Sequence, residues 1–310
     1  MSAVEAAGAP PRAPAATPAS WLVWTALGIV YVVWGSTYLA IRVMVETVPP
    51  LLGAGLRFAL AGAAMVGVLA ARRGWRAVRP TRPQLAGALL VGVLLPGANA
   101  VVTVAEVHVP SNIAALLIAA VPLVIVVLRG ATGDAPSRAG LVGVLVGFAG
   151  VALLLAPGGR PGGASLAGMA GCLVAATMWA TGSFTASRLD LPPDPLVSTG
   201  WQMLLGGVVI VAAGLVAGEA LDPSGFSADS VLAFAYLVLV GSVIAFTAYA
   251  WLLRNVPVSK VATYAYVNPA IAIVLGWLVL DEVITGVTLA GAAVIVAGVA
   301  VVVRSESVRR

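Results

Sequence analysis

Aromatic and polar side chains recur at helical spacing inside long apolar runs of this sequence. Trp34, Tyr38 and Arg42 stand four residues apart, so in a helix they share one face. Tyr264 and Asn268 repeat this spacing much later in the chain. Polar groups inside a membrane helix are costly, and they usually face a cavity or a partner helix. A cavity lined by aromatic and hydrogen-bonding groups suits an amphipathic solute.

The residues predicted to line one such cavity come from both halves of the chain. They are Trp34, Tyr38, Arg57, Asn99, Trp179, Thr181, Gln202, Tyr249, Tyr264 and Asn268. Two of them have a structural alternative. Thr181 belongs to a stripe with Thr177 and Thr185, and threonine in a membrane helix often bonds its own backbone. Arg57 either snorkels to the surface or pairs with a nearby glutamate, or it holds a carboxylate or phosphate of the solute.

Few ionisable groups are placed to carry a proton. Glu106 and the single histidine, His108, lie together at one end of an apolar run, and they are the candidates for proton coupling. A lone histidine is more often a hydrogen-bonded structural group, so the sequence permits this coupling without requiring it. With one cysteine, Cys172, and no HExxH pattern, we expect no metal site, no cofactor and no catalytic residues.

Three prolines interrupt apolar runs where a bend would act on the cavity. Pro96, Pro122 and Pro269 each remove a helical hydrogen bond and can kink the chain. They are interpreted either as gating kinks that rock between two states or as fixed structural bends.

The elements that carry these residues must be membrane helices. Of the 310 residues, 61% are apolar and 9% are charged, against about 45–50% and about 25% in soluble proteins. A helix needs about 20 apolar residues to cross the hydrocarbon. The sequence therefore predicts an all-α membrane protein with ten transmembrane helices, at 21–45, 51–71, 84–105, 110–129, 138–156, 166–187, 195–217, 229–253, 258–280 and 286–304.

The basic residues predict the orientation. If the N-terminus is cytoplasmic and the number of spans is even, 14 of the 17 lysines and arginines fall in cytoplasmic segments, and Arg160 alone falls in an outside loop. Both termini are then cytoplasmic. The same rule accounts for the net charge of +5, so no nucleic-acid partner is expected.

The two halves of the chain match each other in order. Trp34-Gly35-Ser36 aligns with Trp179-Ala180-Thr181, 145 residues later, and Pro110 and Pro122 align with Pro257 and Pro269 at an offset of 147. Each half would hold five helices, and an odd unit must insert its second copy upside down. The interpretation is a pair of inverted five-helix repeats, a hallmark of secondary transporters; the alternative is chance matching among apolar helices.

Several of these segments resemble a known family. The run from Trp34 to Tyr38, Pro49-Pro50 and Arg57-Phe58 resemble the start of an EamA-type domain of the drug/metabolite transporter superfamily. Residues 102–122, and later 254–256 and 262–269, are similar to its YedA-like inner-membrane exporters. The resemblance implies a ten-helix, two-repeat exporter of amino acids, metabolites or drug-like solutes. Lys260 departs from the family pattern, where a small or apolar residue is usual.

The composition and the resemblance together set the expected organisation. It comprises a flexible tail at 1–19, a first EamA-type repeat at 20–157, a second at 165–304 and a cytoplasmic tail at 305–310. We expect a secondary transporter of the cell inner membrane that exports small organic solutes by alternating access. The expected partners are a small-molecule substrate and the lipid bilayer, with a monomer preferred and a homodimer left open. An intramembrane enzyme and a channel-like facilitator are the alternatives.

Overall fold

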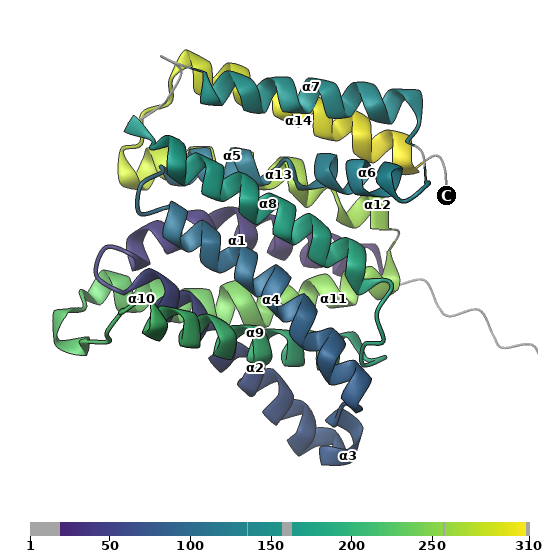
Figure 1. Ribbon diagram of the computed structural model, residues 1–310, viewed down its shortest axis with the longest axis vertical. Coiled ribbons are helices and arrows are strands. Elements are labelled where there is room, and N and C mark those ends of the chain that lie inside the picture. The colour runs from purple at the N-terminus through teal and green to yellow at the C-terminus, as the bar shows by residue number, and fades with distance from the viewer. Residues whose placement is uncertain (1–18, 135, 157–162, 257, 308–310) are drawn as a thin grey trace, which may run out of the picture.

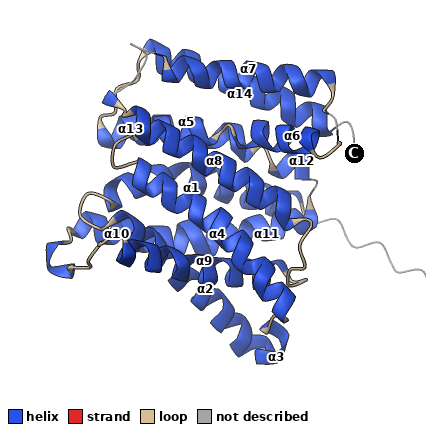
Figure 2. Cartoon of the chain, viewed as in Figure 1, coloured by secondary structure: helices blue, strands red, loops and turns tan. Residues whose placement is uncertain are grey.

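The computed structural model describes residues 19–134, 136–156, 163–256 and 258–307 (Figure 1). Throughout these ranges the chain is all-helical, with no strand (Figure 2). Nine of the described helical segments are long and apolar enough to cross a membrane, and one further apolar helix is shorter. The nine are α1 (Ser20–Met44), α2 (Pro50–Arg73), α4 (Arg82–Ala105), α5 with α6 (Ser111–Ile118, Val121–Ala131), α7 (Arg138–Leu155), α8 (Leu166–Ala186), α9 (Pro195–Val216), α10 through η3 to α11 (Ala228–Tyr236, Leu237–Ile244, Ala245–Asn255) and α14 (Gly286–Ser307).

The shorter apolar helix is α13, Tyr264–Leu280, and the remaining helical pieces are α3 (Trp75–Val78), η2 (Pro223–Gly225) and α12 (Val258–Val261). The prediction of a helical membrane protein is confirmed. The single span predicted at 258–280 is instead divided, because the backbone turns at residues 262–263 between α12 and α13. The span predicted at 110–129 also has a break, at Ala119–Ala120, just before α6 begins with Val121 and Pro122.

Helix starts follow from side-chain caps that the local sequence supplies. Thr81 and Gln84 form a capping box at α4, in which each side chain accepts from the other residue's backbone amide. Asp194 caps α9 by accepting from the amides of Leu196 and Val197, at 2.8 and 3.3 Å. Pro50 occupies the first turn of α2, where its missing N–H has no helical partner in any case.

Two antiparallel helix pairs hold the bundle together through small residues. Along α2 and α9, Gly55 lies against Val211 and Gly62 lies against Leu204, so residue numbers rise on one helix as they fall on the other. The pair α7 and α14, which lie side by side at one end of Figure 1, is built the same way, with Gly143 against the carbonyl of Gly298. Such close backbone approach is typical of membrane helix pairs with glycine at the interface.

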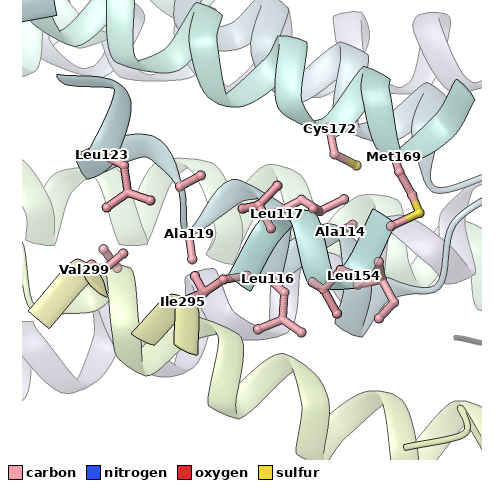
Figure 3. Close-up of a cluster of buried hydrophobic side chains, with 14 of the residues drawn as sticks. Ala114, Leu116, Leu117, Ala119, Leu123, Leu154, Met169, Cys172, Ile295 and Val299 are labelled. Carbon is pink, nitrogen blue, oxygen red and sulfur yellow. The ribbon is translucent and has the colours of Figure 1, made fainter. Parts of the chain in front are cut away.

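The largest buried hydrophobic cluster lies between α7 and α14 on one side and α5, α6 and α8 on the other (Figure 3). Leu117, Leu123, Leu154 and Met169 are fully buried there, and the free Cys172 lies beside them. This packing fixes α5 and α6, which carry part of the cavity wall described below.

Some sequence predictions concern residues outside the described ranges. These are positions 1–18 of the expected tail, Arg160 and Pro257. At the other end of the chain, α14 continues to Ser307, three residues beyond the expected end of the second repeat.

Candidate functional site

A cavity of about 90 Å³ lies at the centre of the bundle, among α1, α2, α4, α5, α6, α8, α11 and α13. Seven of the ten residues predicted to form a cavity line it, together with two of the three prolines. They are Trp34, Tyr38, Arg57, Asn99, Trp179, Tyr264, Asn268, Pro122 and Pro269. Helices from both halves of the chain therefore contribute to one site.

Trp34 is the centre of an aromatic cluster on one wall of this cavity. Its ring lies 5.1 Å from the ring of Phe246, 5.1 Å from Tyr264 and 6.3 Å from Trp179, each in an edge-to-face arrangement. Tyr249 lies 5.0 Å from Trp34, but it does not line the cavity and so supports the cluster from outside it. Edge-to-face pairs fix ring orientation, so the wall presents a rigid apolar surface to a ligand.

Arg57 places a cation in the cavity. Its side chain is 3% exposed, so it does not snorkel to the surface. Its Nε donates to Ser242 Oγ at 2.9 Å, and its guanidinium carbon lies 4.7 Å from the centre of the Phe58 ring. Ser242 lies in the π-helix η3, an irregularity that often marks functional sites. This is the one hydrogen bond of the guanidinium among the described residues, so its other N–H groups remain for a carboxylate or phosphate.

Asn268 adds an amide beside the aromatic wall. Turned so that its nitrogen faces the carbonyls of Tyr31 and Tyr264, the amide donates to both at 3.2 Å. Its oxygen then remains as an acceptor at the cavity. Together, Arg57, Asn268 and the aromatic wall can bind a solute that has an anionic group and an apolar body.

Two other predicted cavity residues lie outside it. Thr181 Oγ1 donates to the carbonyl of Thr177 at 2.8 Å, and Thr177 and Thr185 bond their own helix in the same way, as the structural alternative anticipated. Gln202 bonds Ser198 on its own helix at 2.8 Å. Pro96 lies inside α4 and is buried, but it does not line the cavity either.

Sequence reasoning missed Thr37, Phe246 and Ser242. Thr37 lies between the predicted Trp34 and Tyr38, and it lines the cavity although its hydroxyl donates to the carbonyl of Trp34. For Phe246 and Ser242, the only hint in the sequence was a single aromatic or serine residue inside an apolar run. The π-helix turns Ser242 toward Arg57, and no sequence pattern predicts that π-helix.

A second, more polar pocket of about 420 Å³ lies at the end of the bundle where α4 ends and α5 begins. Arg42, Glu46, His108, Asp281 and Glu282 line it, and we refer to it as the polar pocket. Arg42 does not pair with Glu46 but donates to the backbone carbonyls of residues 106 and 107, at 2.6 and 3.1 Å. His108 is exposed.

Glu282 and Glu219 each cap the N-terminus of a helix at this same end. The Glu282 carboxylate accepts from the amides of Ser111 and Asn112 at 2.6 and 3.1 Å, which joins the end of α13 to the start of α5. Glu219 likewise accepts from the first amides of α2, at 3.1 and 2.8 Å. Carboxylates at helix N-termini satisfy otherwise unpaired amides and interact favourably with the helix dipole.

Ion pairs join three helices at the opposite end. Asp194 accepts from Arg73 at 2.8 Å and lies 3.4 Å from Arg254, which links the ends of α2, α9 and α11. Partial burial opposes ionisation of Asp194, but the hydrogen bonds from Arg73 and two backbone amides, with the charge of Arg254, lower its pKa below the ordinary value. Asp194 therefore stays ionised at neutral pH.

Lys260, the departure from the family pattern, lies at this end as well. Its Nζ is 4.7 Å from the centre of the Trp24 ring, a cation–π contact. Lys260 is exposed and lies outside the central cavity.

The sequence matches the EamA-like transporter family twice, over residues 20–156 and 166–304. It is 39% identical to the inner membrane transporter YedA of Escherichia coli K12 over 284 residues, which cover 85% of this chain and 89% of the relative. It is 26% identical to a protein of Salmonella typhimurium LT2 described as a probable amino-acid metabolite efflux pump, covering 91% and 95%. A solved crystal structure superposes on 94% of this chain and 98% of its own, with a TM-score of 0.63 and 22% identity, and shows the same fold.

Proposed function

Since the chain belongs to the EamA-like transporter family, we propose that this multi-pass membrane transporter exports small organic solutes by alternating access through its central cavity. The observation that carries the proposal is the placement of Arg57 and the aromatic wall around Trp34 in one cavity between the two halves. The expected site is the cell inner membrane, as for the relative from Escherichia coli.

The lining favours solutes that combine a carboxylate or phosphate with an apolar or aromatic body. Arg57 would bind the anion, the aromatic wall would cover the apolar part, and Asn268 would accept a hydrogen bond from an amine or hydroxyl. Amino acids, metabolites and amphipathic drugs fit this description. The name of the Salmonella relative favours amino acids within this range.

Alternating access would use the two halves as inverted repeats. Two antiparallel pairs, α2 with α9 and α7 with α14, join helices that hold matching places in the two halves. A two-fold axis in the membrane plane would relate such pairs, which supports the inverted arrangement. The offset of about 145 residues between matching motifs supports the same arrangement independently.

Each end of the bundle has contacts that would break when the cavity opens there. At one end Arg42 and Glu282 join α1, α4, α5 and α13. At the other, Asp194 joins α2, α9 and α11. With both termini in the cytoplasm, the first set would be the outer gate and the polar pocket would open to the outside.

The test is counterflow in proteoliposomes that contain the full chain. A screen of amino acids and amphipathic drugs should find a solute whose labelled uptake saturates and rises when unlabelled solute is placed inside. A channel gives flux without this stimulation, and an enzyme would change the solute chemically; either result would overturn the proposal.

A matched pair of variants tests the role of Arg57. Arg57→Gln should lose counterflow of anionic and zwitterionic solutes while the protein still inserts. Arg72→Gln changes an exposed arginine at the other end of the same helix and should transport normally. Equal activity of the two variants would show that Arg57 does not bind the solute.

A further inference from the structure

Five buried polar atoms that have no hydrogen-bond partner among the described residues gather where α4 ends and α5 begins. They are both carboxyl oxygens of Glu106, the hydroxyl of Ser111, and the nitrogen and oxygen of the Asn112 side-chain amide. Glu106 and Ser111 are 0% exposed, and Asn112 is 1% exposed. Buried polar side chains are nearly always hydrogen-bonded. Three neighbouring residues whose buried polar atoms all lack hydrogen bonds therefore indicate a site that changes its hydrogen bonds during function.

The buried Glu106 carboxyl lines neither the central cavity nor the polar pocket, but it interacts with residues of both. It interacts electrostatically with Tyr38 and Arg57, which line the central cavity, and with Arg42 and Glu282, which line the polar pocket. Among the described residues, Cys172 on α8 is a further titratable group that interacts with it. A change of charge on Glu106 would thus act on both the solute site and the proposed outer gate.

The groups around Glu106 have opposite effects on its protonation state. Complete burial without a hydrogen-bond donor favours the neutral acid, and so does the nearby negative charge of Glu282. The positive charges of Arg42 and Arg57 favour the carboxylate. Burial has the largest effect and raises the pKa of Glu106 well above its ordinary value, so the neutral acid is favoured in this structure. A closer approach of Arg42 or Arg57 would favour loss of the proton.

Glu282 and Glu219 show how other carboxyl groups at this end of the protein are hydrogen-bonded. Each accepts hydrogen bonds from two backbone amides at a helix start. Within the described part of the chain no donor bonds Glu106, but the side chains of Ser111 and Asn112 carry oxygen atoms that can accept from a protonated carboxyl and N–H or O–H groups that can donate to a carboxylate. His108, the other residue that the sequence offers for proton binding, is exposed and lines the polar pocket.

Resting on the transport function proposed above, we propose that Glu106 is the proton-binding group that couples solute export to proton entry, with Ser111 and Asn112 as its partners in the neutral state. The carboxylate takes up one proton from the polar pocket to become the acid, which donates its O–H to Ser111 Oγ or Asn112 Oδ1. Release of that proton on the cytoplasmic side restores the carboxylate, and no electron is transferred.

A labelling experiment on the wild-type chain tests the proton site without knowing the solute. Dicyclohexylcarbodiimide is apolar and reacts with buried protonated carboxyls. The acid adds across one C=N bond, with its proton going to nitrogen, and the adduct rearranges to an N-acylurea without losing an atom. Mass spectrometry should find the label on Glu106, with a rate that falls about tenfold per pH unit above its midpoint. Glu219 and Glu282, each hydrogen-bonded to two backbone amides, are internal controls that should react more slowly than Glu106 at the same pH. No label on Glu106 at any pH would overturn the proposal.

Transport in proteoliposomes then tests coupling, with the solute that gives saturable counterflow in the screen. Glu106→Gln mimics the neutral acid, so it should retain counterflow but lose, by at least about tenfold, the accumulation driven by an imposed pH gradient. Glu219→Gln should retain both. Glu106→Gln that still responds to the pH gradient, or a wild-type protein driven by a sodium gradient instead, would overturn the proposal. Absence of counterflow in the wild type would refute the transport function, whereas the labelling result would still report on Glu106.

Discussion

Substituting Gly55 by alanine should separate two helices that hold the cavity in shape. A Cβ at this position would lie 2.6 Å from the backbone nitrogen of Val211 and 2.7 Å from its Cγ2, about 0.8 Å closer than the shortest ordinary contact. Because the backbone atom cannot rotate away as a flexible side chain would, α2 and α9 must move apart. Overpacking of this kind costs about 1–3 kcal/mol.

Gly67 on the same helix provides the matched control. A Cβ there would meet no atom within 4 Å, and the residue is exposed. Alanine in place of glycine favours a helix by about 1 kcal/mol in both variants, so the difference between them isolates the steric cost. One kcal/mol corresponds to about 2–4 °C in chains of 150–250 residues, and we expect Gly55→Ala to melt several degrees below Gly67→Ala.

Thermal midpoints from fluorescence-detected size exclusion measure this difference. Gly55 lies two residues before Arg57, so the displaced helix should also raise the solute KM in counterflow. Equal midpoints for Gly55→Ala and Gly67→Ala would refute the reasoning, because they would mean that α2 and α9 are not in the close contact described here.

Three further predictions concern the cavity and the ion pairs. Ser242→Ala removes the described hydrogen-bond partner of Arg57. Because a hydrogen bond to a charged group contributes about 1.5–3 kcal/mol, the solute KM in counterflow should rise about tenfold or more. An unchanged saturation curve would contradict this. Trp179→Ala should strongly reduce counterflow, whereas Thr181→Val, which loses only a bond within its own helix, should stay within about twofold of the wild-type rate. The pKa of Asp194 is below its unfolded value of about 3.9, so its stabilising effect is present above about pH 4 and is lost as the pH falls through the folded pKa. Asp194→Asn, which preserves the helix cap, should lower stability at neutral pH by about 1 kcal/mol or less and leave it unchanged at the lowest pH, as thermal melts across pH would show.

The helices could be located from the sequence because lipid imposes a strict rule. A spanning segment must satisfy its own backbone and present apolar side chains, so each long apolar run predicts a helix. The breaks at Ala119–Ala120 and at 262–263, and the π-helix that holds Ser242, could not be located, because protein contacts compensate for them and the hydropathy stays high throughout.

The sequence by itself determined the membrane helices and most of the aromatic face, since residues four apart on a helix share a side whatever the neighbours are. Trp34 and Tyr38 follow from that periodicity alone, and both line the cavity. Only the tertiary structure decided which polar residues serve the cavity. Arg57 is directed there by Ser242 from a distant helix, while Thr181 bonds its own backbone and Glu106 has no hydrogen-bond partner among the described residues. The physical reason is that helical periodicity defines the direction of a side chain, whereas the burial and charge it meets depend on which other helix packs against it.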